Sequence, residues 1–264
     1  YWRNPPFLFS RMMLITILSI VFGCTYYKLK VVSVANVVSA VASASISATF
    51  GALSHGAASM PVFINNRPVC YRESASRMYN AGLWAVVGVI TELFFVIWSA
   101  ALLQLPAYFL IDFAHDAAKY FLYYLATYTV CMVYISMSMM VSALAPSGPI
   151  AGVMQGMYFG FFFSFNGVGI PTPNVPAGYL WLYRALPLSH ITEMIAMPQY
   201  KDNFDPLILL DGSSTTVREY IATYFGFSYG DSSYFHNLGY VVLFFVVTQI
   251  IGFVATLKLN HSKR

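Results

Sequence analysis

Charged residues are scarce in this sequence. Asp, Glu, Lys and Arg together make up 9% of its 264 residues, whereas hydrophobic residues make up 58%. The mean hydropathy of +0.65 lies outside the usual range of water-soluble domains. The net charge is only +4 and the basic residues are scattered, so nothing in the sequence points to a nucleic-acid-binding surface.

Residue patterns that carry catalysis are missing as well. The sequence has no Gly-rich phosphate loop, no HExxH motif and no pair of carboxylates at catalytic spacing, and its histidines lie far apart. Cys24, Cys70 and Cys131 lack the spacing of metal ligands, which favours their interpretation as buried small hydrophobic residues. We therefore predict that this chain is not an enzyme and that it holds no metal or other cofactor.

Long uncharged runs are abundant instead, and crossing a bilayer takes about 20 apolar residues. We predict one all-α membrane domain over residues 1–264 with six transmembrane helices. Its expected parts are an interfacial helix (1–11), helices one to five (12–168), a long loop outside the membrane (169–236), helix six (237–257) and a polar tail (258–264).

The distribution of charge predicts which side is cytosolic. With six spans, residues 1–11, 60–78, 145–149 and 258–264 share one side, and that side carries more Lys and Arg than the other. Most of the acidic residues fall on the opposite side, chiefly in the long loop. By the positive-inside rule, both termini are expected to be cytosolic and the loop at 169–236 extracellular.

One stretch, Ala145–Pro171, combines regularly spaced glycines with many aromatic residues. On a helix, a residue every four positions lies on one face, where a second backbone can approach closely. The glycines that make this face are Gly148, Gly152, Gly156 and Gly160. We predict a packing helix at the centre of the bundle, and sliding against its neighbour during transport is a second interpretation. The phenylalanines at 159 and 161–163 are either lipid-facing filler or a hydrophobic constriction.

Glu92 is the only ionisable residue in the third predicted span, residues 81–107. An ionisable group inside a membrane is costly and usually faces protein or a water-filled cavity. Two interpretations follow, a gate or proton-linked group, or an intramembrane anchor bonded to a neighbouring helix or to a basic residue near the cytosolic ends. We favour the anchor.

Several strings together resemble one family. They are YWRNP before the first span, RPVCYRESASRMYN before the third, and FNGVGIPTPNVPAGYLWLYRALPLSHITEMIAMPQYKD after the fifth. The chain resembles the transmembrane domain of a G-subfamily ABC transporter of the pleiotropic drug resistance type, most closely the second, C-terminal domain of the full-size members.

This resemblance implies an ATP-driven exporter in the plasma membrane that moves hydrophobic or amphipathic compounds, such as drugs, other xenobiotics or lipids. Two membrane domains, from one polypeptide or from a dimer, would enclose a central cavity. ATP and Mg would bind in associated nucleotide-binding domains, because the sequence itself contains no Walker A motif. The resemblance also implies an N-terminal interfacial connecting helix at 1–11 and short extracellular re-entrant helices within 172–200.

The resemblance assigns roles to individual residues. It places the substrate cavity on helices two and five, at Ser47, Phe50, Gly51, Ser54, Phe162 and Phe163. On helix two, the spacing of Ser43, Ser47, Phe50 and Ser54 selects largely the same face. Val168 and Gly169 fall at the upper gate, where Gly169 departs from the bulky aliphatic residues that the family often carries. Tyr71, Arg72 and Glu73 fall in the elbow that couples to the nucleotide-binding domain.

A non-transporting membrane protein, such as a channel or a receptor-like module, is the alternative. A channel should carry a continuous polar face along at least two helices. Only the second helix hints at such a face, through Ser43, Ser47 and Ser54.

Overall fold

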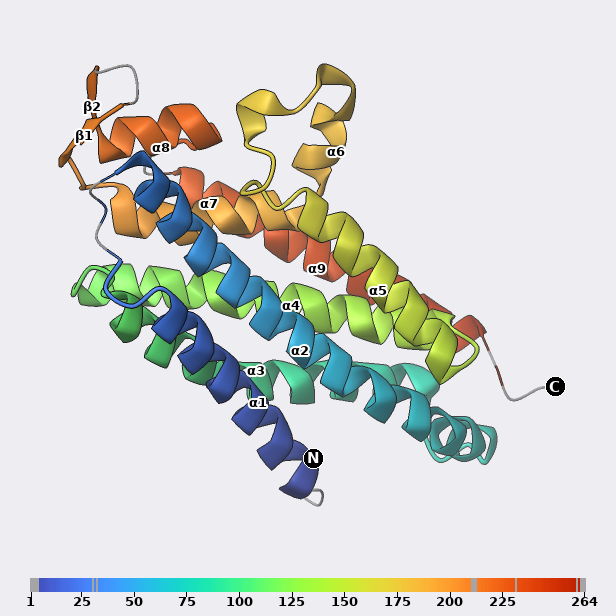
Figure 1. Cartoon of the computed structure of the whole chain (residues 1–264). Helices are drawn as coiled ribbons and strands as arrows, with labels where there is room; N and C mark the ends of the chain where they lie inside the picture. The colour runs from blue at the N-terminus through green and yellow to red at the C-terminus, as the bar shows by residue number, and fades with distance from the viewer. Residues whose placement is uncertain are drawn as a thin grey trace.

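The computed structural model describes residues 5–29, 31, 33–209, 213–230, 232–259 and 261, and it is mostly helical (Figure 1). The long helices are α1 (Pro5–Thr25), α2 (Val34–Ala75), α3 (Ala81–Ile111), α4 (Ala117–Leu144), α5 (Gly148–Ser164) and α9 (Ser233–Lys258). Between α5 and α9 lie short elements, η1 (Thr172–Asn174), η2 (Ala177–Tyr179), α6 (Leu180–Ala185), α7 (Pro187–Tyr200), β1 (Pro206–Ile208), β2 (Ser214–Thr216) and α8 (Val217–Phe225).

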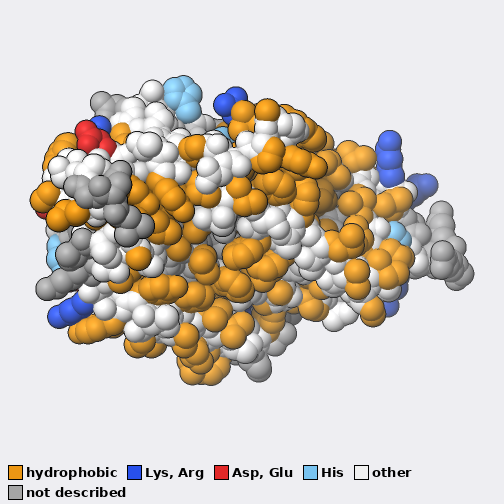
Figure 2. Space-filling model, turned by 45° about the horizontal axis from the view of Figure 1, so that its top comes forward, with side chains coloured by type: hydrophobic (Ala, Val, Ile, Leu, Met, Phe, Trp, Pro, Cys, Tyr) orange, Lys and Arg blue, Asp and Glu red, His pale blue; other side chains and the backbone are white. Residues whose placement is uncertain are grey.

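The long helices give the molecule an apolar exterior suited to lipid. Among the described residues, α1, α2, α3, α4 and α9 are long and apolar enough to cross a membrane. Helix α5 has 17 residues, the lower limit of the roughly 17–25 that a span requires. Hydrophobic side chains are spread over the whole face shown in Figure 2, and charged side chains are few there. The protein is therefore an integral membrane protein of the all-α class.

Helix α4 forms the centre of the bundle. Of its most apolar stretch, 78% is buried inside the protein, against 17% for α9 and 28% for α3. It packs against α2 on one side and α9 on the other, while α1 packs mainly on α3. The outer faces of α3 and α9 are thus left for contact with lipid.

Polar side chains fix where the helices begin. Ser33, Asn80 and Asp116 each accept a hydrogen bond from a backbone N–H in the first turn of α2, α3 and α4, respectively. Such bonds satisfy donors that the helix itself leaves unpaired. At α8, Thr216 and Glu219 form a reciprocal capping box.

Two predicted boundaries near the membrane surface fall inside helices. Helix α1 runs without a break from Pro5 to Thr25, so residues 5–11 belong to the same helix as the first predicted span, and their interfacial position stays a prediction. Residues 1–4 of the predicted interfacial helix lie outside the described part of the chain. Helix α2 continues to Ala75, so most of the predicted 60–78 loop is helical, despite Pro61 and Pro68 within it.

Helix α5 lies at the edge of the bundle (Figure 1), which corrects the prediction that it forms the centre. It buries only Ala151, Gln155 and Phe162, a single narrow stripe. The glycines that suggested a central position lie on its uncovered side.

The turns of the bundle separate into two ends. The start of α1, the α2–α3 turn, the α4–α5 turn and the end of α9 lie at one end in Figure 1, and α6, α8 and the β-hairpin lie at the other. Strands β1 and β2 pair antiparallel, with Leu207 opposite Thr215. This hairpin lies within the predicted long loop at 169–236.

Candidate functional site

An aromatic cluster joins α2 to α5 on the outer side of the bundle. The ring of Phe50 lies edge-on to the rings of Phe159 and Phe163, with centroids 5.8 Å apart in both cases. Phe159 and Phe163 stack on each other at 5.7 Å. All three side chains are half-buried, so the cluster presents an apolar aromatic surface that a further molecule can contact.

The predicted wall on α2 divides into two parts. Phe50 and Ser54 are half-exposed, whereas Ser47 and Gly51 are buried within the bundle. A Cβ atom placed on Gly51 would collide with the side chain of Leu103 on α3. Residues 47, 50, 51 and 54 spread over about 100° of the helix. Because such an arc is wider than the exposed strip, the structure brings only Phe50 and Ser54 to the proposed cavity surface.

Phe162 is also on the wrong side for that surface. Its side chain is 5% exposed, and its ring packs against Phe244 of α9 at 5.8 Å. Successive residues on a helix point about 100° apart, so Phe162 and Phe163 cannot line the same wall. The structure therefore assigns Phe162 to the core and leaves Phe163 on the outer face.

Phe159 is the residue that the sequence-based set omits. It precedes Phe163 by four positions, so the two side chains lie on one face of α5. This spacing is visible in the sequence and would have selected Phe159 in place of Phe162.

The glycine stripe of α5 lies next to this cluster and is uncovered. A Cβ atom placed on Gly148, Gly152, Gly156 or Gly160 would meet no atom of another described part of the chain within 4 Å. No described helix of this chain uses the stripe as a packing groove. The packing role stays a prediction.

The predicted gate segment forms a tightly held turn after α5. The side-chain oxygen of the buried Asn166 accepts hydrogen bonds from the backbone N–H groups of Val168 at 2.9 Å and Gly169 at 3.1 Å. Thr192 of α7 donates its hydroxyl to the Asn166 carbonyl at 2.6 Å. Val168 is half-buried and Gly169 is exposed, so the turn presents Gly169 without a side chain.

Gly167→Ala is expected to destabilise this turn, whereas Gly169→Ala is not. Gly167 has a φ of +81°, and a Cβ atom there would lie 2.8 Å from the hydroxyl of Tyr183. A left-handed conformation alone costs a non-glycine residue about 1–2 kcal/mol. At Gly169 the only nearby atom is the Asn166 side-chain oxygen, at 3.9 Å. Thermal unfolding in detergent measures both variants, and equal midpoints would contradict the prediction.

The predicted coupling elbow lies in the last turns of α2. Arg72 is exposed, and the Tyr71 hydroxyl donates to the backbone carbonyl of Leu259 beyond α9 at 3.3 Å. Glu73 accepts a hydrogen bond from the Tyr79 hydroxyl at 2.5 Å, and this bond raises the pKa of Tyr79 to about 12. The elbow is thus bonded to the α2–α3 turn and to the end of α9.

Glu92 lies in a buried polar group that joins three helices. Its carboxylate accepts two hydrogen bonds from Arg11 of α1, at 2.8 Å from Nη2 and 3.4 Å from Nη1. The Nε–H of Arg11 donates to Nδ1 of His55 on α2 at 2.7 Å, which places the imidazole proton on Nε2. All three residues are buried. The geometry matches the anchor interpretation in having a basic partner, and the role itself stays a prediction.

Comparison with known proteins places this geometry in context. Residues 1–200 match the family described as ABC-2 type transporter. Over its whole length the chain is 28% identical to ABC transporter G family member 40 of Arabidopsis thaliana and to ABC transporter G family member 36 of Oryza sativa subsp. japonica. It is 26% identical, over 87% of its length, to Pleiotropic drug resistance protein 1 of Nicotiana tabacum. The chain spans 18% of the length of the first two relatives and 16% of the third.

Proposed function

Because this chain belongs to the ABC-2 type transporter family, we propose that it is the membrane-spanning half of an ATP-driven exporter of hydrophobic or amphipathic compounds. ATP and Mg bind in separate nucleotide-binding domains, since the sequence has no Walker A motif of its own. Family membership also disfavours the alternative of a non-transporting channel or receptor-like module.

The observation that carries this proposal is the half-exposed aromatic cluster of Phe50, Phe159 and Phe163 beside an uncovered glycine stripe. A stripe of glycines lets a second helix approach closely in a membrane, and the neighbouring rings offer a ligand aromatic contacts, so this face is suited to both. In the proposed assembly a second membrane domain covers the face, and the aromatic rings line the cavity between the two domains. Binding then rests on apolar burial and ring contacts, which tolerate many substrates.

In the proposed cycle, closure of the nucleotide-binding domains pushes on the elbow at Tyr71, Arg72 and Glu73. Helix α2 extends from the elbow to Phe50 without interruption, so it can transmit that motion to the cavity. As α2 and α5 rock, substrate is forced past the turn at Val168 and Gly169. The Asn166 hydrogen bonds support a gate that moves as one unit.

The proposed topology has six spans, with α5 as the fifth and both termini in the cytosol of a cell whose plasma membrane holds the protein. Grouping of the elbow and the α4–α5 turn at one end of the bundle supports this arrangement (Figure 1). Helices α6 and α7 then correspond to the extracellular re-entrant segment. Most of the α7 side chains are buried against α4 and α9, as a segment returning toward the membrane requires.

Phe50→Ala and Phe163→Ala are expected to weaken the response to substrate. Each change removes ring contacts worth about 0.5–1.5 kcal/mol beyond the lost apolar area. In the reconstituted transporter, the drug concentration for half-maximal ATPase stimulation should therefore rise by about tenfold.

Phe161→Ala provides the matched control for these variants. Phe161 is 45% exposed and lies on the same helix, but it points about 200° away from Phe163. Phe161→Ala should leave the drug-stimulated ATPase response unchanged. An unchanged response in both Phe50→Ala and Phe163→Ala would refute the cavity assignment.

A further inference from the structure

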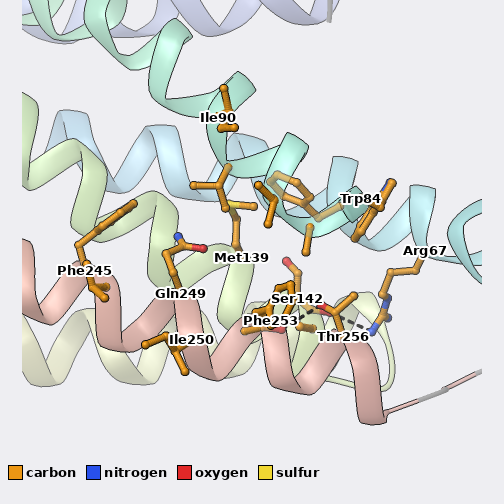
Figure 3. A pocket seen from close by; sticks show the side chains of 17 residues that line it. Arg67, Trp84, Ile90, Met139, Ser142, Phe245, Gln249, Ile250, Phe253 and Thr256 are labelled. Atoms are coloured by element: carbon orange, nitrogen blue, oxygen red, sulfur yellow. Dashed lines mark hydrogen bonds between the residues drawn. The ribbon is translucent and has the colours of Figure 1, made fainter. Parts of the chain in front are cut away.

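An apolar cavity, lined by none of the three rings of the aromatic cluster, lies among α2, α3, α4 and α9. It has a volume of about 320 Å³ and is bounded by the end of α2, the first half of α3, the last turns of α4, and α9 (Figure 3). Its floor includes Phe63, Met139 and Ala143, which are at most 9% exposed. Volumes of 300–1,000 Å³ are typical of sites for small ligands.

The mouth of this cavity opens toward lipid. Val86 and Ile90 of α3 and Val246 and Ile250 of α9 line it, and their side chains are 44–61% exposed. These residues lie on the outer faces of the two helices that bury least of their apolar surface among α2, α3, α4 and α9. In a membrane, the molecules that reach this mouth first are therefore lipids.

Polar groups gather at one end of the cavity. Arg67, Ser142 and Thr256 line the end next to the α4–α5 turn, as Figure 3 shows for their labelled side chains. The other end, around Phe245 and Ile90, is lined by apolar side chains except for Gln249 (Figure 3). A ligand that matches this distribution is amphipathic and carries an anionic group at its polar end.

The length of the cavity matches one leaflet of the bilayer. Along α9 its lining runs from Phe245 to Thr256, which are 256 − 245 = 11 residues apart. At about 1.5 Å per residue this distance is roughly 17 Å. Half of a bilayer's hydrocarbon core measures about 15 Å. An acyl chain that extends from the membrane surface to the midplane therefore spans the cavity from end to end.

We propose that this cavity binds one acyl chain of an anionic phospholipid, with the phosphate near Arg67 and the chain lying between α3 and α9. Each Lys or Arg near the membrane surface attracts an anionic lipid by about 1 kcal/mol. Through Arg67 this attraction favours an anionic over a zwitterionic headgroup by roughly fivefold. The site is separate from the proposed transport cavity and holds a resident lipid that fills the gap between α3 and α9.

Trp84 gives a direct readout, because it lines the cavity. Two variants of the full chain are placed in phosphatidylcholine nanodiscs, one that retains only Trp84 and one that retains only Trp98. Trp98 lies on the same helix and is 60% exposed, so it reports contact with bulk lipid. The remaining tryptophans are replaced by phenylalanine, and brominated phosphatidylglycerol or brominated phosphatidylcholine is then added as a quencher.

Trp84 quenching should reach a plateau at a few mole per cent of brominated phosphatidylglycerol and require about fivefold more brominated phosphatidylcholine. Quenching of Trp98 should rise in proportion to either lipid. If Trp84 also follows the mole fraction of both lipids, contact is only that of bulk lipid and the proposal is wrong.

Two further variants separate occupancy of the cavity from a folding defect. Ala85→Phe adds a ring to the lining and should abolish the plateau. Val87 lies outside the lining and is 54% exposed, so Val87→Phe should retain the plateau. Persistence of the plateau in Ala85→Phe would overturn the proposal.

Gln249 lines the cavity with a buried amide nitrogen that has no hydrogen-bond partner among the described residues. Gln249→Leu should keep the plateau, and its loss would indicate a polar ligand instead of an acyl chain.

Discussion

Replacing Glu92 with leucine should lower the free energy of unfolding by about 3–5 kcal/mol, because it leaves the guanidinium of Arg11 buried without its carboxylate. The side chains of the pair are 3% and 0% exposed, so solvent does not screen the loss. Thermal unfolding in detergent, followed by size-exclusion chromatography of the folded fraction, measures this effect. Glu92→Gln keeps an acceptor for Arg11 but removes the charge, so its free energy of unfolding should lie between those of Glu92→Leu and the unmodified protein.

The double variant Arg11→Met/Glu92→Leu is the control for this result. Removing both charges of a buried ion pair is often neutral or stabilising by about 1–4 kcal/mol, because neither charge then has to be desolvated. The double variant should therefore recover most of the stability that Glu92→Leu loses. If Glu92→Leu alone is as stable as the unmodified protein, the Arg11–Glu92 pair does not contribute to the fold.

The same double variant distinguishes the two interpretations of Glu92. If Glu92 is only an anchor, a folded double variant still exports substrate when it is assembled with its nucleotide-binding domains. If Glu92 is a gate or a proton-linked group, the double variant folds but loses export. We expect export to persist, because the carboxylate is bonded to Arg11 and is 0% exposed.

The positions of the long helices could be predicted from the sequence because bilayer thickness sets their length. The third span is predicted at 81–107 and the fourth between it and residue 168, and helices α3 and α4 cover Ala81–Ile111 and Ala117–Leu144. The first residues of both helices are fixed by the N-cap side chains of Asn80 and Asp116, and this capping role depends on local sequence. The resemblance to pleiotropic drug resistance transporters is likewise confirmed by the match to the family.

Contacts between distant segments could not be predicted in the same way. The sequence indicated that Glu92 needs a partner, but Arg11 is 81 residues away and only the fold brings them together. A similar limit applies to α5, since glycine spacing predicts a close approach without identifying the helix that approaches. Periodicity selected a face of α2 that includes the buried Ser47 as well as Phe50, and the neighbouring α3 covers the adjacent Gly51. Packing therefore decided which of the predicted residues reach the candidate cavity.

Arg67 is expected to be the second residue whose loss strongly destabilises the protein. The final carbonyl groups of a helix have no partner within it. In α4, Nη1 of Arg67 donates to the carbonyls of Ser142 at 2.9 Å and Ala145 at 2.7 Å, and His261 lies 3.1 Å from the carbonyl of Ala143. Arg67 therefore caps α4 and ties the extension of α2 to the α4–α5 turn.

Arg67→Leu should lower the free energy of unfolding by about 3 kcal/mol or more, because each hydrogen bond from a charged group contributes about 1.5–3 kcal/mol. Arg67→Lys can restore one of the two bonds and should lose about half as much. Arg72→Leu is the matched control, since Arg72 is exposed on the same helix and surface changes usually stay within about 0.5 kcal/mol. Thermal unfolding compares the three variants, and equal losses in Arg67→Leu and Arg72→Leu would show that Arg67 does not act as the cap. A loss confined to Arg67 would mean that the elbow and the start of α5 are held in place by one side chain, so that a push on α2 displaces both helices of the proposed cavity together.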